Sequence, residues 1–275
     1  MAAVSQIDDE SVFDTPARQC YHTALHVLRT AGAPFVVGGA FAFRYYTGIT
    51  RHTKDLDLFI RPRDLERTLG ALEGAGYRTE VTYRTWLAKG YLGDHFIDVI
   101  FNLGNGIRPV DDDWFAHALG AELFGEPVRI SPPEEMLWSK AFTMARDRYD
   151  GADVAHLLRA CGDRMDWPRL LRRFGEHWPV LYGHLIHFRY IYPGEGHQIP
   201  GWVMEEFAGR LRDSLGTPPA VARRSPPLCR GPYLGAEQYD VDTEEWGYQD
   251  ARLRPWGTMS PDDLAQWKEA RAAGK

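Results

Sequence analysis

The chain has 275 residues, of which 44% are hydrophobic and 25% are charged, so it can bury a real core as one large domain or two small ones. Its formal net charge of −6 argues against a protein that coats nucleic acid through bulk electrostatics, and leaves room for a local basic groove. We expect a cytoplasmic protein with no membrane partner. There is no apolar run of the roughly 18–20 residues that a transmembrane helix needs, the N-terminus lacks a signal-peptide pattern, and the three scattered cysteines fit reduced thiols.

The first part of the chain predicts alternating helices and strands. Apolar residues at three- and four-residue spacing predict a helix over residues 15–33, followed by the short buried strand "PFVVGG". A helix is expected right after Gly39, then the strand "DLDLFI" and an amphipathic helix over residues 62–77. "TYRTWLAKGYL" and "HFIDVIFNL" predict two strands joined by the Gly93–Asp94 turn. We therefore expect an α/β (α+β) catalytic core with a mixed sheet over residues 1–130.

The chain changes character after residue 130. Ser131 and Glu134 have the spacing of a capping box, with Pro132 at the first helical position. Helical periodicity then continues, so residues 131–215 are expected to form a helical domain that completes the nucleotide site. Residues 216–275 are expected to form a linker rich in Pro and Arg and an aromatic, acidic tail with a second capped helix starting at Ser260.

Two aspartates in the strand "DLDLFI" point to a metal site. Asp55 and Asp57 are two residues apart, which places both side chains on one face of a strand. Neighbouring carboxylates repel unless a proton or a cation lies between them, and Mg²⁺ takes a few carboxylates together with phosphate oxygens. Gly38 and Gly39 precede a helix, where backbone N–H groups approach phosphate closely. The segment predicts a phosphate cradle beside a metal site; the alternative is a solvated strand face.

A third carboxylate, Asp98, lies among the apolar residues of "HFIDVIF". An ionised group is costly to bury there without a partner. If this strand lies beside "DLDLFI", Asp98 can join the metal cluster or accept a proton from an attacking hydroxyl. Three carboxylates around two metal ions fit in-line phosphoryl transfer. The alternative is a structural acid paired with Arg or Lys.

The segments "VVGGAFAF", "TRHTKDLDLFI" and "FIDVIF" together resemble the DNA-polymerase-β-like nucleotidyltransferase superfamily over residues 35–103. That superfamily has a Gly-Gly turn, a short helix, an Asp-x-Asp strand and a later acid in this order. The run that includes Thr53 and Lys54 is similar to antibiotic nucleotidyltransferases and AbiEii/MenT-type toxins. The resemblance implies that the acids are catalytic and bind metal and that the glycines, Thr53 and Lys54 bind nucleotide. The acids are Asp55, Asp57 and Asp98, and the glycines are Gly38 and Gly39.

The resemblance extends to charged residues after the core. AbiEii/MenT-type proteins have a helical Lys, Arg, Asp, Asp pattern that contributes to the nucleotide site, and Lys140, Asp150 and Asp153 match it here. A lysine near a triphosphate neutralises charge as a point cation. The alternative is a solvated helix face with ion pairs three or four residues apart.

Other charged or titratable residues have plainer interpretations. Arg169, Arg172 and Arg173 in "RLLRRF" predict a solvated helix face, with a polyanion site as the alternative. His184 and His187 share a face of an apolar helix without an acid at ligand spacing, so we expect core or capped histidines rather than metal ligands.

These patterns predict a metal-dependent nucleotidyltransferase that moves an NMP from an NTP such as ATP to a hydroxyl acceptor and releases pyrophosphate. Mg²⁺ is the expected ion, with Mn²⁺ as a substitute. A toxin-like enzyme would modify tRNA or protein and would have an antitoxin partner. The alternatives are an antibiotic-type enzyme with a small-molecule acceptor and a non-catalytic nucleotide-binding module on the same fold.

Overall fold

The computed structural model describes residues 15–51, 53–216 and 226–272. The chain divides into two compact units, one formed by residues 1–132 and 258–275 and the other by residues 133–257. The functional division at residues 131 and 216 stays a prediction, and part of the expected linker, residues 217–225, lies outside the described residues. Within the described ranges, no helix is long and apolar enough to span a membrane.

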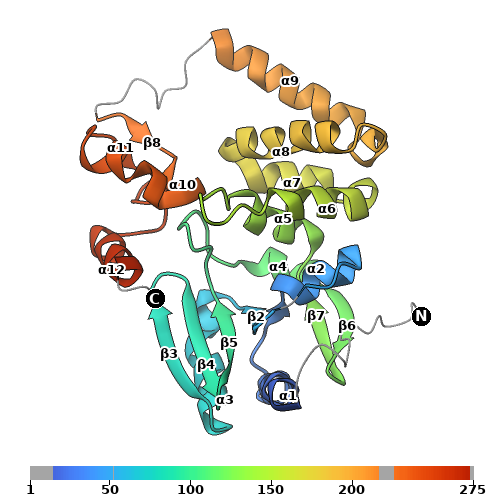
Figure 1. Ribbon diagram of the computed structural model, residues 1–275, viewed down its shortest axis with the longest axis vertical. Helices are drawn as coiled ribbons and strands as arrows, with labels where there is room; N and C mark the ends of the chain where they lie inside the picture. Colours follow the sequence, from blue (N-terminus) through green and yellow to red (C-terminus); the bar gives the residue numbers. More distant parts are fainter. Residues whose placement is uncertain (1–14, 52, 217–225, 273–275) are drawn as a thin grey trace. The chain divides into compact units, whose positions relative to one another are not determined.

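The first unit is built on a mixed seven-stranded sheet in the order β3-β4-β5-β2-β1-β7-β6 (Figure 1). The pairs β2–β5 and β1–β7 are parallel, and the other neighbouring strands are antiparallel. The strands are β1 (Val36–Val37), β2 (Asp55–Phe59), β3 (Arg78–Tyr83), β4 (Leu87–Leu92), β5 (His95–Ile100), β6 (Leu119–Leu123) and β7 (Glu126–Ile130). The mixed sheet confirms the predicted fold class.

The two faces of this sheet differ in polarity. Leu56 and Leu58 of β2 are fully buried, whereas the two aspartates between and before them are partly exposed. Helices cover the apolar face: α1 contacts β5, β7 and α3, and α3 contacts β3. The helices of the unit are α1 (Thr15–Thr30), α2 (Gly39–Thr47), α3 (Leu65–Gly74), α4 (Asp112–Ala116) and α12 (Pro261–Ala272), with a 3₁₀ turn, Pro62–Asp64, before α3. The period of two along β2 thus separates a core face from a carboxylate face.

Two sequence-based expectations for this unit were wrong or incomplete. The strand expected over "TYRTWLAKGYL" is two strands, because the chain turns between β3 and β4 at residues 84–86. The β6–β7 hairpin was not predicted. Its turn has positive φ at both Phe124 (52°) and Gly125 (79°). Such turns usually have the sequence Asn-Gly or Asp-Gly, and the phenylalanine at the first position made this one unrecognisable from the sequence.

The second unit is helical, as predicted. Its longer helices are α5 (Pro133–Ala141), α6 (Gly151–Cys161), α7 (Trp167–Phe174), α8 (Trp178–Ile191) and α9 (Gly201–Gly216). Short elements follow: β8 (Leu228–Cys229), α10 (Pro232–Gly235), α11 (Asp240–Glu244) and β9 (Gln249–Asp250), with 3₁₀ turns at Gly162–Arg164, Gly175–His177, Gly196–Gln198 and Ala236–Tyr239. His184 of α8 is buried and its Nε2 lies 2.8 Å from the Ala141 carbonyl oxygen, which confirms a core histidine at this position. His187 is exposed and is not part of the core.

One of the two predicted capping boxes is present. At α12 the Ser260 backbone N–H and hydroxyl both contact the Asp263 carboxylate, at 2.9 and 2.8 Å, and the Asp263 N–H donates to Ser260 Oγ. The box expected at Ser131 is absent: its hydroxyl is buried without a hydrogen-bond partner among the described residues. Glu134 accepts a hydrogen bond from the Asp166 N–H instead (2.6 Å), and the helix begins at Pro133.

The arginines of α7 do not form a solvated face. Arg169 and Arg173 are buried, and only Arg172 is exposed. Arg169 forms ion pairs with Glu134 and Glu135 of α5, and Arg173 Nε lies 2.9 Å from Glu135 Oε1. This buried network joins α5 to α7 and removes both arginines from any surface that could bind a polyanion.

Candidate active site

Three charged side chains form one row across the centre of the first unit's sheet. Asp57 of β2 is the register partner of Asp98 on β5, and Asp98 is the register partner of Lys89 on β4. Register partners on adjacent strands point to the same face, so all three side chains share the carboxylate face. Asp55 lies on this face too, two residues before Asp57. The structure therefore places Asp55, Asp57 and Asp98 on one face of adjacent strands, which is the condition under which Asp98 can join the candidate metal cluster.

The Asp57 carboxylate lies against the N-terminus of α2. A Cβ atom added to Gly39 would come within 1.7 Å of Asp57 Oδ2, so this oxygen occupies the space above the Gly39 backbone. The Gly38 N–H donates to the Asp57 carbonyl oxygen at 2.9 Å and fastens the turn to β2. A helix N-terminus attracts negative charge, so the two glycines place a site suited to anions directly beside the carboxylates.

We expect Gly39→Ala to lower the free energy of unfolding by about 2–4 kcal/mol, because alanine is strained at a φ of +53° and its methyl group would displace the Asp57 carboxylate. Gly48→Ala is the matched control, since Gly48 has a φ of +71° with no atom within 4 Å of an added Cβ. The free energy of unfolding of Gly48→Ala should fall by only roughly 1–2 kcal/mol, the cost of a left-handed backbone for alanine. Urea denaturation of both variants measures the difference, and equal losses would contradict the close approach of Asp57.

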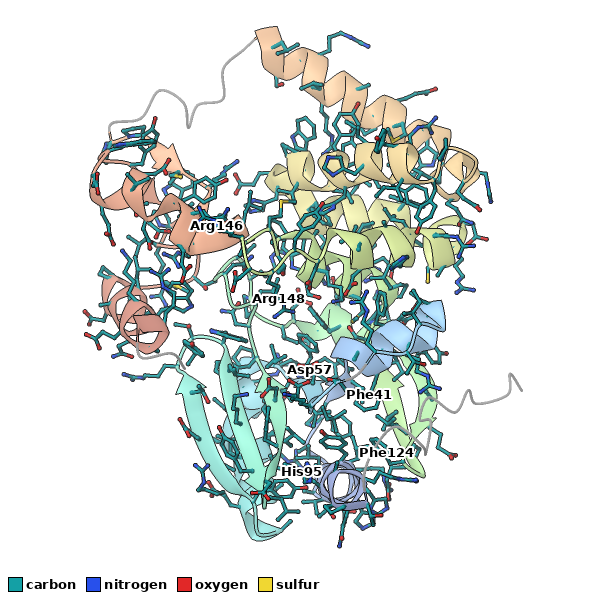
Figure 2. The ribbon with its side chains drawn as sticks, viewed as in Figure 1. Phe41, Asp57, His95, Phe124, Arg146 and Arg148 are labelled. Atoms are coloured by element: carbon teal, nitrogen blue, oxygen red, sulfur yellow. The ribbon has the colours of Figure 1, made fainter. Side chains whose placement is uncertain are left out.

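Aromatic packing fixes α2 in this position (Figure 2). The Phe41 ring of α2 lies 5.6 Å from Phe124 in the β6–β7 turn and 6.3 Å from Tyr21 of α1, and the latter two rings lie 5.7 Å apart. All three side chains are buried. Because Phe41 is the third residue of α2, this cluster holds the helix N-terminus that faces Asp57.

The residues before β2 act on the first aspartate. The Thr53 hydroxyl donates to Asp55 Oδ1 at 2.7 Å, which orients that carboxylate. Lys54 is exposed. The structure thus gives Thr53 a direct contact with the candidate site, and Lys54 a place on the surface next to it.

Asp98 carries a lysine as its ion-pair partner. Lys89 Nζ lies 2.7 Å from Asp98 Oδ1, and the two side chains are 20% and 13% exposed. Burial raises the pKa of the Asp98 carboxyl; the hydrogen bond and charge of Lys89 oppose this rise, and the charge of Asp55 adds to it. The interpretation of Asp98 as an acid paired with a basic residue therefore has a named partner, Lys89, which the sequence analysis did not single out.

A divalent cation such as Mg²⁺ needs several oxygen donors that converge on one point. Among the residues that the structure describes, no group of three or more His, Cys, Asp or Glu side chains has the arrangement of a metal site. The chemistry of the row still fits a hard ion: Asp55 and Asp57 are partly exposed carboxylates on one face, and Asp98 adds a third oxygen donor on the next strand. Asp55 and Asp57 are the residues that would hold such an ion, with Asp98 beside them.

The remaining predicted residues lie in the second unit. Lys140, in the last turn of α5, contacts Asp153 Oδ2 at 2.6 Å and Asp150 Oδ2 at 3.3 Å. Arg148, on the connection between α5 and α6 (Figure 2), lies 3.4 Å from the same Asp150 oxygen. The three predicted residues therefore form one cluster that links two helices, rather than ion pairs along a single helix.

Two glycines at a helix N-terminus and three carboxylates on adjacent strands of a mixed sheet are the features that the sequence analysis associated with nucleotidyltransferases. A family model described as "Uncharacterised nucleotidyltransferase" matches residues 18–178, more than half of the chain, and the chain belongs to this family. This confirms the predicted superfamily. No curated protein matches the sequence.

Solved structures with a similar fold include several nucleotidyltransferases. The antibiotic-resistance factor ANT(2'')-Ia is 19% identical with a TM-score of 0.43, over 64% of this chain and 100% of that chain. The lincosamide antibiotic adenylyltransferase LnuA is 16% identical with a TM-score of 0.38, over 52% of this chain and 96% of that chain. The Megavirus polyadenylate synthase is 15% identical with a TM-score of 0.36, over 55% of this chain and 33% of that chain.

Proposed function

We propose that this chain transfers a nucleoside monophosphate from an NTP to a hydroxyl acceptor. The observation that carries the proposal is that Asp55, Asp57 and Asp98, here called the carboxylate row, lie on one face beside the N-terminus of α2. Asp57 packs against Gly39 there and is in register with Asp98. In the reaction a bond forms between the acceptor oxygen and the α-phosphorus, the bond from that phosphorus to the β-phosphate oxygen breaks, and pyrophosphate leaves.

The residues of the first unit divide the work of binding and proton transfer. Asp55 and Asp57 would hold Mg²⁺, or Mn²⁺ in its place, and a bound ion would neutralise phosphate charge. Gly38 and Gly39 would lie near the phosphates. The Gly38 N–H already donates to the Asp57 carbonyl oxygen, so the backbone N–H groups from Gly39 onward would face them. Asp98, whose pKa is raised by burial, would accept the proton of the acceptor hydroxyl or complete the ligand set.

Residues outside this row would bind the nucleotide. Thr53 supports the site by orienting Asp55, and Lys54 offers a surface charge to the nucleotide. We assign Lys140 as a cation for the triphosphate, with Asp150 and Asp153 holding its ammonium group in place. The three side chains are each less than one-sixth exposed, and the two carboxylates fix the position of the ammonium group.

The reaction is tested by incubating the purified chain with each of four α-labelled NTPs, Mg²⁺ and a cell extract. We expect label to enter an acceptor from one preferred NTP. Transfer from γ-labelled NTP would instead indicate phosphoryl transfer, and transfer of neither label would favour the non-catalytic nucleotide-binding module.

The same experiment identifies the acceptor class. Acid-insoluble label that ribonuclease releases indicates tRNA or another RNA, and acid-insoluble label that protease releases indicates a protein. Acid-soluble label in a product that separates from the NTP indicates a small hydroxylated molecule. A toxin-like role with an antitoxin partner requires one of the first two outcomes. A small-molecule acceptor would place the chain with antibiotic-type enzymes such as those named above.

A further inference from the structure

Lys89 lies beside the carboxylate row, on the neighbouring strand β4. It is the register partner of Asp98 on β4, and its ammonium nitrogen lies 2.7 Å from Asp98 Oδ1. The same nitrogen lies 4.1 Å from the centroid of the Phe96 ring, so an aromatic face also holds it. Lys89 and Asp98 are both mostly buried. Two independent contacts and the strand register therefore fix the position of this cation.

A fixed cation beside Asp98 reduces the repulsion among the carboxylates of the row. Asp55, Asp57 and Asp98 lie on one face of adjacent strands, where neighbouring negative charges destabilise one another. The charge of Asp55 contributes to the raised pKa of Asp98 in this way. Lys89 neutralises one of these negative charges. A divalent cation would reduce the same repulsion among the carboxylates, and its charge would repel the Lys89 ammonium group.

We propose that Lys89 is a resident counter-ion that competes with a divalent cation for Asp98. It is a positioning residue: it stabilises the protein without metal, and it must give up Asp98 before that carboxylate can ligate an ion. The inference rests on the proposed function, since it takes Asp55 and Asp57 as the residues that hold the ion. By this proposal, Lys89 sets the affinity of the site for a divalent cation.

The test measures Mn²⁺ binding by electron paramagnetic resonance in the absence of nucleotide. Lys89→Met keeps the length of the side chain and removes its charge, so we expect Mn²⁺ to bind about tenfold more tightly or better. The metal-free variant should melt at a lower temperature than the wild type, and saturating Mn²⁺ should stabilise the variant by a larger shift. Lys268→Met, the same change of charge on α12 of the same unit, is the matched control and should leave the Mn²⁺ affinity unchanged.

A double-mutant cycle tests whether Lys89 acts through Asp98. In an Asp98→Asn background, Lys89→Met should change Mn²⁺ affinity by much less than it does in the wild type. The reason is that Lys89 and the ion no longer compete for a carboxylate at position 98. Unchanged or weaker Mn²⁺ binding in Lys89→Met, or a full effect in the Asp98→Asn background, would overturn the proposal.

The failure of this inference is distinguishable from failure of the proposed function. Mn²⁺ binding that is lost in Asp57→Asn but unchanged in Lys89→Met would overturn the role of Lys89 alone. Mn²⁺ binding that survives in Asp57→Asn would place the ion elsewhere and would overturn both.

Discussion

Asp57→Asn is expected to lower the rate of nucleotidyl transfer by about a thousandfold. A metal ion on a transferring phosphate supplies several kcal/mol of transition-state stabilisation, and about 4 kcal/mol corresponds to a thousandfold in rate. Asparagine keeps the shape of the side chain and removes the charge that would bind the ion. The loss should appear in kcat, measured with α-labelled NTP at saturating concentrations of NTP and acceptor.

The same substitution should leave the chain folded, because its effects on stability oppose one another. Asp57 gives up a charge beside the N-terminus of α2, which is worth roughly 0.3–1 kcal/mol. Asp55 and Asp98 in turn lose a like-charged neighbour, which favours the folded state. We expect a melting temperature within a few degrees of the wild type, so a loss of activity cannot come from unfolding.

Asp94→Asn is the control for the loss of a carboxylate. Asp94 is an exposed residue in the turn between β4 and β5, in the same unit as Asp57. Its substitution should leave the transfer rate within about twofold of the wild type, since exposed surface changes have small effects. Near-normal turnover in Asp57→Asn, or an equal loss in both variants, would remove Asp57 from the active site.

Local patterns predicted the elements that carry the site. Gly-Gly at the end of a buried strand indicated the start of α2, and alternation in "DLDLFI" indicated a strand with two carboxylates on one face. These predictions depend on neighbours within four residues, where backbone geometry alone decides which side chains share a face. The same holds for the capping box at Ser260.

The pairing of Lys89 with Asp98 was also within reach of the sequence. A two-residue turn at Gly93–Asp94 makes residues equally distant from it register partners. Lys89 and Asp98 are each three positions away from the pair that closes the turn, Leu92 and His95. The signal was missed because the lysine was read as part of a strand rather than as the partner of a particular acid. Hairpin register, unlike most pairings, follows from the turn.

Pairings between distant segments could not be predicted. The register of Asp57 with Asp98 joins two parallel strands that α3 and two further strands separate in the chain, and no local turn sets it. The capping box at Ser131 failed for the same reason. Glu134 has the right spacing, but its carboxylate pairs with Arg169, more than thirty residues away, in a tertiary contact that local spacing does not encode.

The largest expected effect on stability comes from that contact. Arg169→Met should lower the free energy of unfolding by about 3–5 kcal/mol, because it leaves the buried carboxylates of Glu134 and Glu135 without a principal partner. Methionine fills a similar volume, so the loss reflects uncompensated charge rather than a cavity. Arg172→Met is the matched control on the same helix. Arg172 is exposed, and its substitution should change stability by less than about 0.5 kcal/mol.

The pH dependence of the loss identifies its cause. Burial raises the pKa of the Glu135 carboxyl, and the charges of Arg173 and Arg169 oppose the rise, so removing Arg169 should raise this pKa further. A carboxyl whose pKa is higher in the folded than in the unfolded state destabilises the fold above its folded pKa, and this cost vanishes below the unfolded value of about 4.3. The deficit of Arg169→Met relative to the wild type should therefore be larger at pH 8 than at pH 5 in urea denaturation. A deficit that is the same at both pH values would indicate lost packing, and the buried arginine would then be a spacer between α5 and α7 rather than the counter-charge of their carboxylates.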